Sequence, residues 1–258
     1  MPSWLVPSVD VGLVTLLASF TNGILGAGGA ILFVPLALYV LPALGTRLEP
    51  HLVTALSLVQ GICAFLAGIV SYGRRGQVAY GQLWLSGPSL GAGALAGGVL
   101  SAAVPARALV LLFAVVVTAA AVLLLLPLGE TGPRGPAARI VTAAMFLGIG
   151  AVGGAVGVGA GVLVIPVLLY VLGTPQRVAI GTGLVLPVFI SGPAFVGKAV
   201  SGQVPWALVP VVVIVALVGV TLGSRIHLLI SQTVLRLALA GLTGALAFTV
   251  WVRLLEAA

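Results

Sequence analysis

Charged residues are the scarcest class in this sequence. Only 6% of its 258 residues are Asp, Glu, Lys or Arg, whereas a soluble domain carries about 25%. Cysteine occurs once, as Cys63, which excludes a disulfide or a cysteine-based metal site within one chain. The four acidic residues, Asp10, Glu49, Glu130 and Glu256, fall at predicted helix ends or in loops. We therefore expect no buried acidic pair for a metal or for acid–base catalysis, no catalytic residue and no cofactor.

Apolar residues take the place of the missing charges. They make up 61% of the chain, and the mean hydropathy is +1.32. Apolar runs long enough to cross a bilayer as helices recur along the sequence. Eleven Lys and Arg against four acids give a net charge of +7, but the basic residues stand singly between apolar runs. They indicate topology beside anionic lipid rather than a nucleic-acid surface. The sequence predicts an all-α polytopic protein of the cell (inner) membrane.

One stretch occurs twice. Residues 23–41 hold a glycine cluster, an apolar run and Pro35, and residues 154–172 repeat this order with Pro166. The second copy begins 131 residues after the first (154 − 23 = 131). Further matches, such as the Gly-Gln-Val turns at 76–78 and 202–204, extend the pairing over most of both halves. We interpret this as an internal duplication, with repeats at 1–128 and 140–258 and a linker at 129–139.

Each repeat is expected to contain a glycine-broken helix pair and three further helices. The expected segments are 10–25, 30–41, 51–70, 83–103 and 108–127, then 140–156, 160–172, 178–197, 204–223 and 233–252.

Five segments per half would invert the second half relative to the first. The basic residues then divide into Arg74, Arg75, Arg134, Arg139, Arg177, Arg225 and Arg236 against Arg47, Arg107, Lys198 and Arg253. Seven against four places the first group in the cytoplasm and both termini outside. If each broken pair were one span, eight spans would result and the halves would run parallel.

The two glycine clusters are the predicted substrate site. A helix that restarts within the membrane exposes free N–H groups and the positive end of its dipole, and both attract an anion. Hydroxyl and amide groups on nearby helices could donate further hydrogen bonds. The candidate substrate-binding residues are Asn22, Gly26, Gly28, Gly29, Thr54, Ser57, Gln60, Gly157, Gly159, Gly161 and Thr182. The alternative is that the glycines serve close helix packing and that the hydroxyls bond their own backbone.

Other residues have weaker or purely structural interpretations. His51 is a candidate for proton coupling, because histidine titrates near neutral pH. Arg74 and Arg75 could attract anions to one mouth, or could only set the orientation. Lys198 is expected to reach the interface from a helix end. The pairs Gly93/Gly97 and Gly219/Gly223, each at a spacing of four, are predicted to be helix-packing faces.

These motifs together resemble the sulfite exporter TauE/SafE family. The resemblance rests on G-x-G-G-A at 26–30 with Pro35 and G-x-G-A-G at 157–161 with Pro166, and covers about residues 10–254. Family members often have three consecutive glycines, and Ala30 and Ala160 each replace one here. The resemblance implies transport of sulfite, sulfonates or related sulfur-containing anions.

The resulting hypothesis is a secondary transporter for small anions that works by alternating access at the repeat interface. A non-transporting membrane assembly factor and a membrane-embedded enzyme are the alternatives, but an enzyme would need a catalytic dyad or metal cluster that the sequence does not contain. The expected partners are the anionic substrate and the lipid bilayer, with a homodimer left open.

Overall fold

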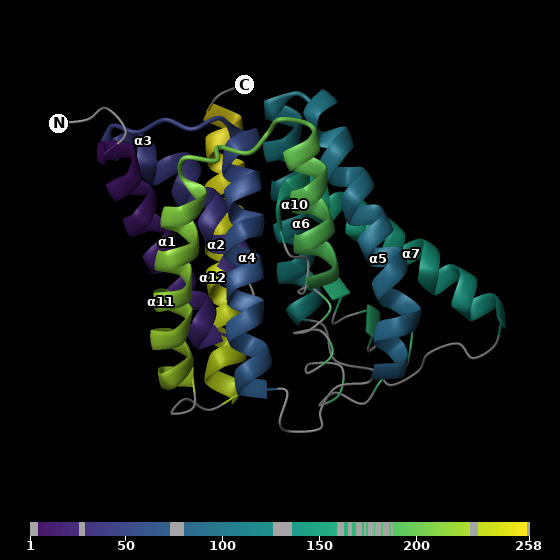
Figure 1. Ribbon diagram of the computed structural model, residues 1–258. Coiled ribbons are helices and arrows are strands. Elements are labelled where there is room, and N and C mark those ends of the chain that lie inside the picture. Colours follow the sequence, from purple (N-terminus) through teal and green to yellow (C-terminus); the bar gives the residue numbers. More distant parts are fainter. Residues whose placement is uncertain are drawn as a thin grey trace.

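The computed structural model is a bundle of helices (Figure 1). The structure describes residues 5–25, 29–72, 80–125, 136–158, 163–164, 167–168, 172, 174, 178, 182, 186, 188–227 and 232–256. The first-half helices are α1 (Leu5–Leu25), α2 (Gly29–Pro35), α3 (Leu41–Leu44), α4 (Pro50–Tyr72), α5 (Tyr80–Leu100) and α6 (Ala106–Leu125). The second-half helices are α7 (Pro136–Val156), α10 (Val188–Val200), α11 (Val209–His227) and α12 (Gln232–Glu256). Among the described residues no strand is found.

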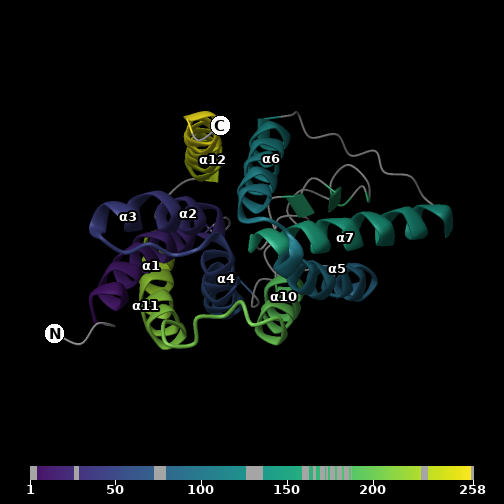
Figure 2. The ribbon, with the colours of Figure 1, turned by 90° about the horizontal axis from the view of Figure 1, so that it is seen from above.

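Two pairs of helices from opposite halves form the closest contacts of the bundle. α1 lies along α11, and α5 lies along α7 (Figure 2). The contacts Gly93–Leu147 and Gly97–Ala151 advance together along α5 and α7, so these two helices run parallel. α10 also packs against α5, while α4 packs against α11 and α10. The start of α1 and the end of α12 lie at the same end of the bundle, at the top of Figure 1.

Glycine makes these contacts as close as they are. A Cβ added at Gly97 would overlap the carbonyl of Ala151 on α7, and one added at Gly223 would overlap the carbonyl of Phe20 on α1. Only a residue without a side chain lets the two backbones approach this closely. The packing interpretation of the two glycine pairs is therefore confirmed.

The segment after the first glycine cluster is one helix with a wider turn inside it. The backbone is helical from residue 29 to residue 44, and residues Leu36–Val40 form a π-helical stretch directly after Pro35. The N–H of Leu41 donates to the carbonyl of Leu36, five residues earlier. Proline has no N–H group, so the ladder is already interrupted at Pro35, and a π-turn can be inserted next to that interruption.

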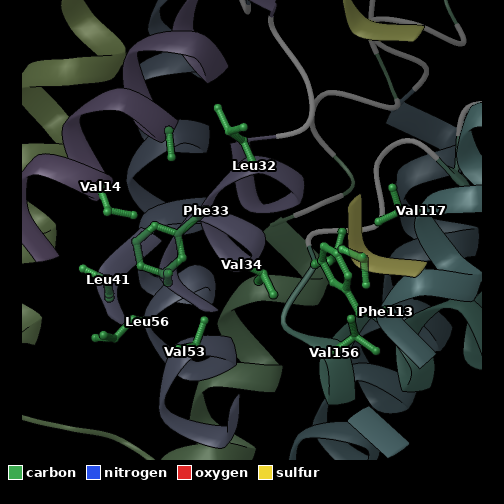
Figure 3. Close-up of a cluster of buried hydrophobic side chains, with 14 of the residues drawn as sticks. Val14, Leu32, Phe33, Val34, Leu41, Val53, Leu56, Phe113, Val117 and Val156 are labelled. Carbon is green, nitrogen blue, oxygen red and sulfur yellow. The ribbon is translucent and has the colours of Figure 1, made fainter. Parts of the chain in front are cut away.

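The largest apolar cluster joins the N-terminal helices to α6 and to the end of α7. Phe33 on α2 lies among Val14, Leu41 and Leu56, while Phe113 on α6 lies beside Val156 (Figure 3). A second cluster, with Leu90, Phe146 and Ile190 at its centre, fills the space between α5, α7 and α10. α4 contributes side chains to both clusters.

The outer faces of the bundle are apolar as well. Trp84, Ile140 and Phe248 are each more than 70% exposed. In the described part of the chain, one stretch, Val209–Ile226, is a helix long and apolar enough to cross a membrane by itself, and several shorter apolar helices accompany it. An exterior of this kind is what hydrocarbon surroundings require.

Some expected boundaries differ from the observed ones. α1 begins at Leu5 rather than near residue 10, so Asp10 lies within the helix and is buried, where its Oδ2 accepts a 2.6 Å hydrogen bond from Thr46 Oγ1. α7 begins at Pro136, which shortens the predicted linker, because proline is well accommodated in the first turn of a helix. α10 is described from Val188 to Val200, and within the expected segment 178–197 residues 178 and 182 are helical as well.

Gly97→Ala should lower the free energy of unfolding, because the new methyl group would meet the Ala151 carbonyl on α7. Overpacking of this kind costs about 1–3 kcal/mol. Gly148→Ala on α7 is the matched control, since a Cβ there meets nothing within 4 Å. Thermal unfolding of the two purified variants in one detergent tests this. Equal midpoints for both would contradict the packing role of Gly97.

Candidate functional site

α4 is the helix that carries most of the predicted polar residues, and it lies inside the bundle. In Figure 2 it stands between the α1–α11 pair and α10. Thr54, Ser57 and Gln60 are all buried, although each bears a polar group. In apolar surroundings such groups need hydrogen-bond partners. Their hydrogen-bond partners show to which other parts of the bundle α4 is joined.

Ser57 joins α4 to the second glycine cluster. Its Oγ lies 2.6 Å from the carbonyl oxygen of Gly157 and 2.7 Å from that of Thr54, and its single proton can serve one of them at a time. Gly157 follows the last residue of α7 with φ = +75°, a conformation that favours glycine. A Cβ at this position would also overlap the Thr54 carbonyl. Gly157 thus ends α7 directly against α4.

Gln60 joins α4 to α1. Its Nε2 donates a 3.1 Å hydrogen bond to Ser19 Oγ, and both side chains are fully buried. Its Oε1 has no hydrogen-bond partner among the described residues. Leaving such a group unpaired costs about 1–3 kcal/mol, so this amide marks a place where a partner is missing.

The two predicted threonines are both buried. Thr54 Oγ1 donates a 2.9 Å bond to the carbonyl of His51, one helical turn earlier on α4. Thr182 is helical, and the N–H of Leu186 donates to its carbonyl. Asn22 is half-buried near the end of α1, and Gly29 is the first residue of α2, close to the restart that the sequence predicted. The predicted residues Gly26, Gly28, Gly159, Gly161, Arg74 and Arg75 lie outside the described residues.

A second polar cluster, which the sequence did not predict, surrounds Lys198 near the end of α10. Lys198 is fully buried, and its Nζ donates to Ser101 Oγ at 2.9 Å and to Gln203 Oε1 at 3.1 Å. The expectation that Lys198 reaches the interface was wrong, because its helix turns this residue toward α5.

His51 belongs to this second cluster. It lies in the first turn of α4, half-buried, with Nδ1 3.3 Å from Gln203 Oε1. Gln203 Nε2 donates in turn to the Gly98 carbonyl and to Ser201 Oγ. Four helix ends or turns therefore meet through these side chains. A role of His51 in coupling stays a proposal.

A helical pattern in the sequence could have revealed the burial of Lys198. Ser191, Ala194 and Gly197 are small residues spaced by three along α10, and all three are buried. Lys198 follows Ala194 by four and Ser191 by seven, which places it on the same face. Small residues mark the face of a membrane helix that packs against its neighbours.

Comparison with known proteins agrees with this picture of a membrane bundle. Residues 11–250 match the family model described as sulfite exporter TauE/SafE. The chain is also 29% identical over 174 residues to a protein named probable membrane transporter protein from Xylella fastidiosa strain Temecula1, and equally to its counterpart in strain 9a5c. Each alignment covers 65% of this chain and 65% of the relative, so the chain spans just under two thirds of the curated relatives that it matches. No solved structure matches.

The family model covers nearly the whole described bundle, including both glycine clusters, α4 and the Lys198 cluster. The resemblance first noted in the motifs is thereby confirmed. The chain belongs to the sulfite exporter TauE/SafE family.

Proposed function

We propose that this protein is a secondary transporter of small anions such as sulfite, sulfonates or related sulfur-containing oxyanions. The anion binds midway along α4, and movement of one repeat against the other exposes it alternately to the two sides of the cell membrane. The observation that carries the proposal is the Gln60 amide, which is buried on a central helix with one end unpartnered among the described residues.

The chemistry of this amide suits an anion. If the amide group is turned by 180°, Ser19 can donate its hydroxyl proton to Oε1, and the NH₂ group then points its two donors away from α1. An oxyanion would accept hydrogen bonds from those two N–H donors, which would then no longer be unpaired. The hydroxyls of Thr54 and Ser57 can also rotate away from the carbonyls that they now serve. N–H groups at the glycine clusters, including Gly29 at the start of α2, would complete the site.

The glycine contacts support an origin of the bundle in two repeats. Gly97 packs against Ala151, and Gly223 packs against Phe20. Gly223 corresponds to Gly97 at an offset of 126 (223 − 97 = 126), and Ala151 corresponds to Phe20 at an offset of 131 (151 − 20 = 131). The first helix of each half, α1 or α7, therefore packs on the corresponding partner in the other half, α11 or α5, in the same register.

The wider helical turns support the same conclusion. In the first half the N–H of Leu41 donates to the carbonyl of Leu36. In the second half the N–H of Leu172 donates to the carbonyl of Val167, at 3.2 Å, and both residues lie 131 positions later. A π-turn is rare and is often found at functional sites, so its occurrence at equivalent positions favours a repeated working element.

The helix directions support inversion of the second repeat. α7 runs parallel to α5, whereas the equivalent of α7, α1, runs parallel to α11 and opposite to α5 (Figure 1). Burial also removes Lys198 from the residues that set orientation. The basic residues then divide seven against three (four minus Lys198), which favours the assigned orientation more strongly than before.

The orientation can be tested with reporter tags. Tags at the two termini should report the periplasmic side, and a tag within residues 129–135 should report the cytoplasm. Cysteine labelling in intact cells and in inverted vesicles checks the assignment independently. Termini and linker on one side would instead favour parallel halves.

Replacing Gln60 with Met, which has a similar volume, should weaken equilibrium anion binding by about ten- to a hundredfold, because a hydrogen bond to a charged group contributes about 1.5–3 kcal/mol. Thr54→Val and Thr182→Val should weaken binding in the same direction. Thr118→Val on α6 is the matched control, since its hydroxyl bonds Trp251 and its own helix. Affinity for sulfite and uptake into proteoliposomes are the two measurements.

High salt separates this mechanism from attraction by surface charge. Neutralising Arg74 and Arg75 should slow anion entry at low salt and should leave the affinity at high salt unchanged. If the arginine variants lose affinity at high salt while the Gln60 and threonine variants keep it, the proposed central site is wrong.

A further inference from the structure

The lysine at the end of α10 is buried without an opposite charge. Lys198 has no exposed surface, and within the described residues its ammonium group contacts neutral atoms, namely Ser101 Oγ and Gln203 Oε1. An ammonium group has three donors, so one of them has no partner in the described part of the chain. A buried charge is tolerated only when other groups compensate it. A compensating anion is therefore the missing component of this cluster.

The surrounding side chains already form a site for a negatively charged oxygen. Lys198 Nζ, Ser101 Oγ and His51 Nδ1 lie 3.1, 3.0 and 3.3 Å from a single atom, Gln203 Oε1. An amide oxygen has two lone pairs, and three groups that can donate lie within reach of this one. The single proton of Ser101 is shared with the Gly98 carbonyl, 2.7 Å away, and His51 donates when its Nδ1 is protonated. Convergence of a cation, a hydroxyl and a ring N–H on one oxygen is the arrangement by which proteins hold oxyanions.

We propose that Lys198, Ser101 and His51 form a second anion site, in which one oxygen of a small oxyanion takes the position now held by the Gln203 amide oxygen. The inference rests on the proposed anion transport and adds a site to it. This second site lies nine residues from Gln60 along α4 (60 − 51 = 9), or about 14 Å at 1.5 Å per residue. It lies at the end of the bundle that holds the start of α1 and the end of α12 (Figure 1).

The position of Gln203 allows this exchange. Gln203 belongs to the short connection between α10 and α11, and it follows Gly202, whose φ is +74°. Trp206 in the same connection is 62% exposed and packs edge-to-face on Phe195, with 5.9 Å between ring centroids. Gly202 and Trp206 are exposed while the Gln203 side chain itself is buried, so the exchange requires the connection to move this side chain outward while the helices stay packed. In the empty state Gln203 would act as an internal substitute for the anion.

Trp206 is also a built-in reporter for the test. In a full-length protein with Trp4, Trp84 and Trp251 replaced by Phe, displacement of Gln203 should change the Trp206 emission. Sulfite, sulfate and methanesulfonate are titrated separately at fixed ionic strength. At least one should give a saturable change, and Lys198→Met should weaken that response about ten- to a hundredfold. Lys198→Arg should retain a measurable part of it.

A matched pair of serine variants guards against a purely structural effect. Ser101→Ala should weaken the response about tenfold, since it removes one donor to the anion. Ser86→Ala on α5 should leave it unchanged, because Ser86 is equally buried and its hydroxyl has no hydrogen-bond partner among the described residues. Gln203→Met should tighten binding severalfold, because the competing amide oxygen is gone. A lysine with a structural role only would not produce this gain.

The outcomes separate this inference from the proposed function. No Trp206 response to any of the three anions, or an equal response in Lys198→Met, overturns the second site, while uptake that still depends on Gln60 leaves the central site standing. A Lys198-dependent response that survives in Gln60→Met supports the second site. If uptake is unaffected by Gln60→Met in that case, the central site alone is wrong.

Discussion

Close contact between helix backbones is the constraint on which the rest of the bundle depends. Lipid is as apolar as leucine, so the helices gain little by burying apolar side chains against each other and associate through close packing instead. Gly97 against Ala151 and Gly223 against Phe20 supply that packing for two pairs of helices. Each pair joins one helix of the first half to one of the second, so neither half forms its packed core alone. α4 then lies between these pairs and contacts α10.

The polar groups of α4 are informative because they are few and because the medium around them is apolar. Ser57 Oγ lies within hydrogen-bond distance of the Gly157 carbonyl at the end of α7, and Gln60 donates to Ser19 on α1. His51 Nδ1 lies within hydrogen-bond distance of Gln203 Oε1 after α10. These bonds link α4 to α1, to the end of α7 and to the connection after α10, and any movement of the halves must break or exchange some of them. In a low-dielectric interior such exchanges are energetically large. A ligand that offers replacement partners can therefore bias which arrangement is populated.

Dipoles and a buried cation can both hold an anion, but they differ when the site is empty. Helix N-termini carry partial charges that are part of the backbone and persist at little cost. An ammonium group in apolar surroundings must be compensated at all times. Around Lys198 two neutral groups, the amide oxygen of Gln203 and the hydroxyl of Ser101, supply part of that compensation when the site is empty. The sequence-based hypothesis considered helix dipoles and neutral hydroxyl and amide donors, and the structure adds a buried lysine to the same bundle.

The amino-acid sequence by itself determined the membrane class, most helix positions and the packing role of the paired glycines, because these depend on composition and on local spacing. It also indicated that a helix restarts close to residue 29, where α2 begins. Only the tertiary structure decided that His51, Ser101 and Gln203 surround Lys198. Those residues lie up to 152 positions apart in the chain. Their meeting follows from which faces of α4, α5 and α10 pack together, and that choice is made by backbone contacts between distant helices rather than by any local pattern.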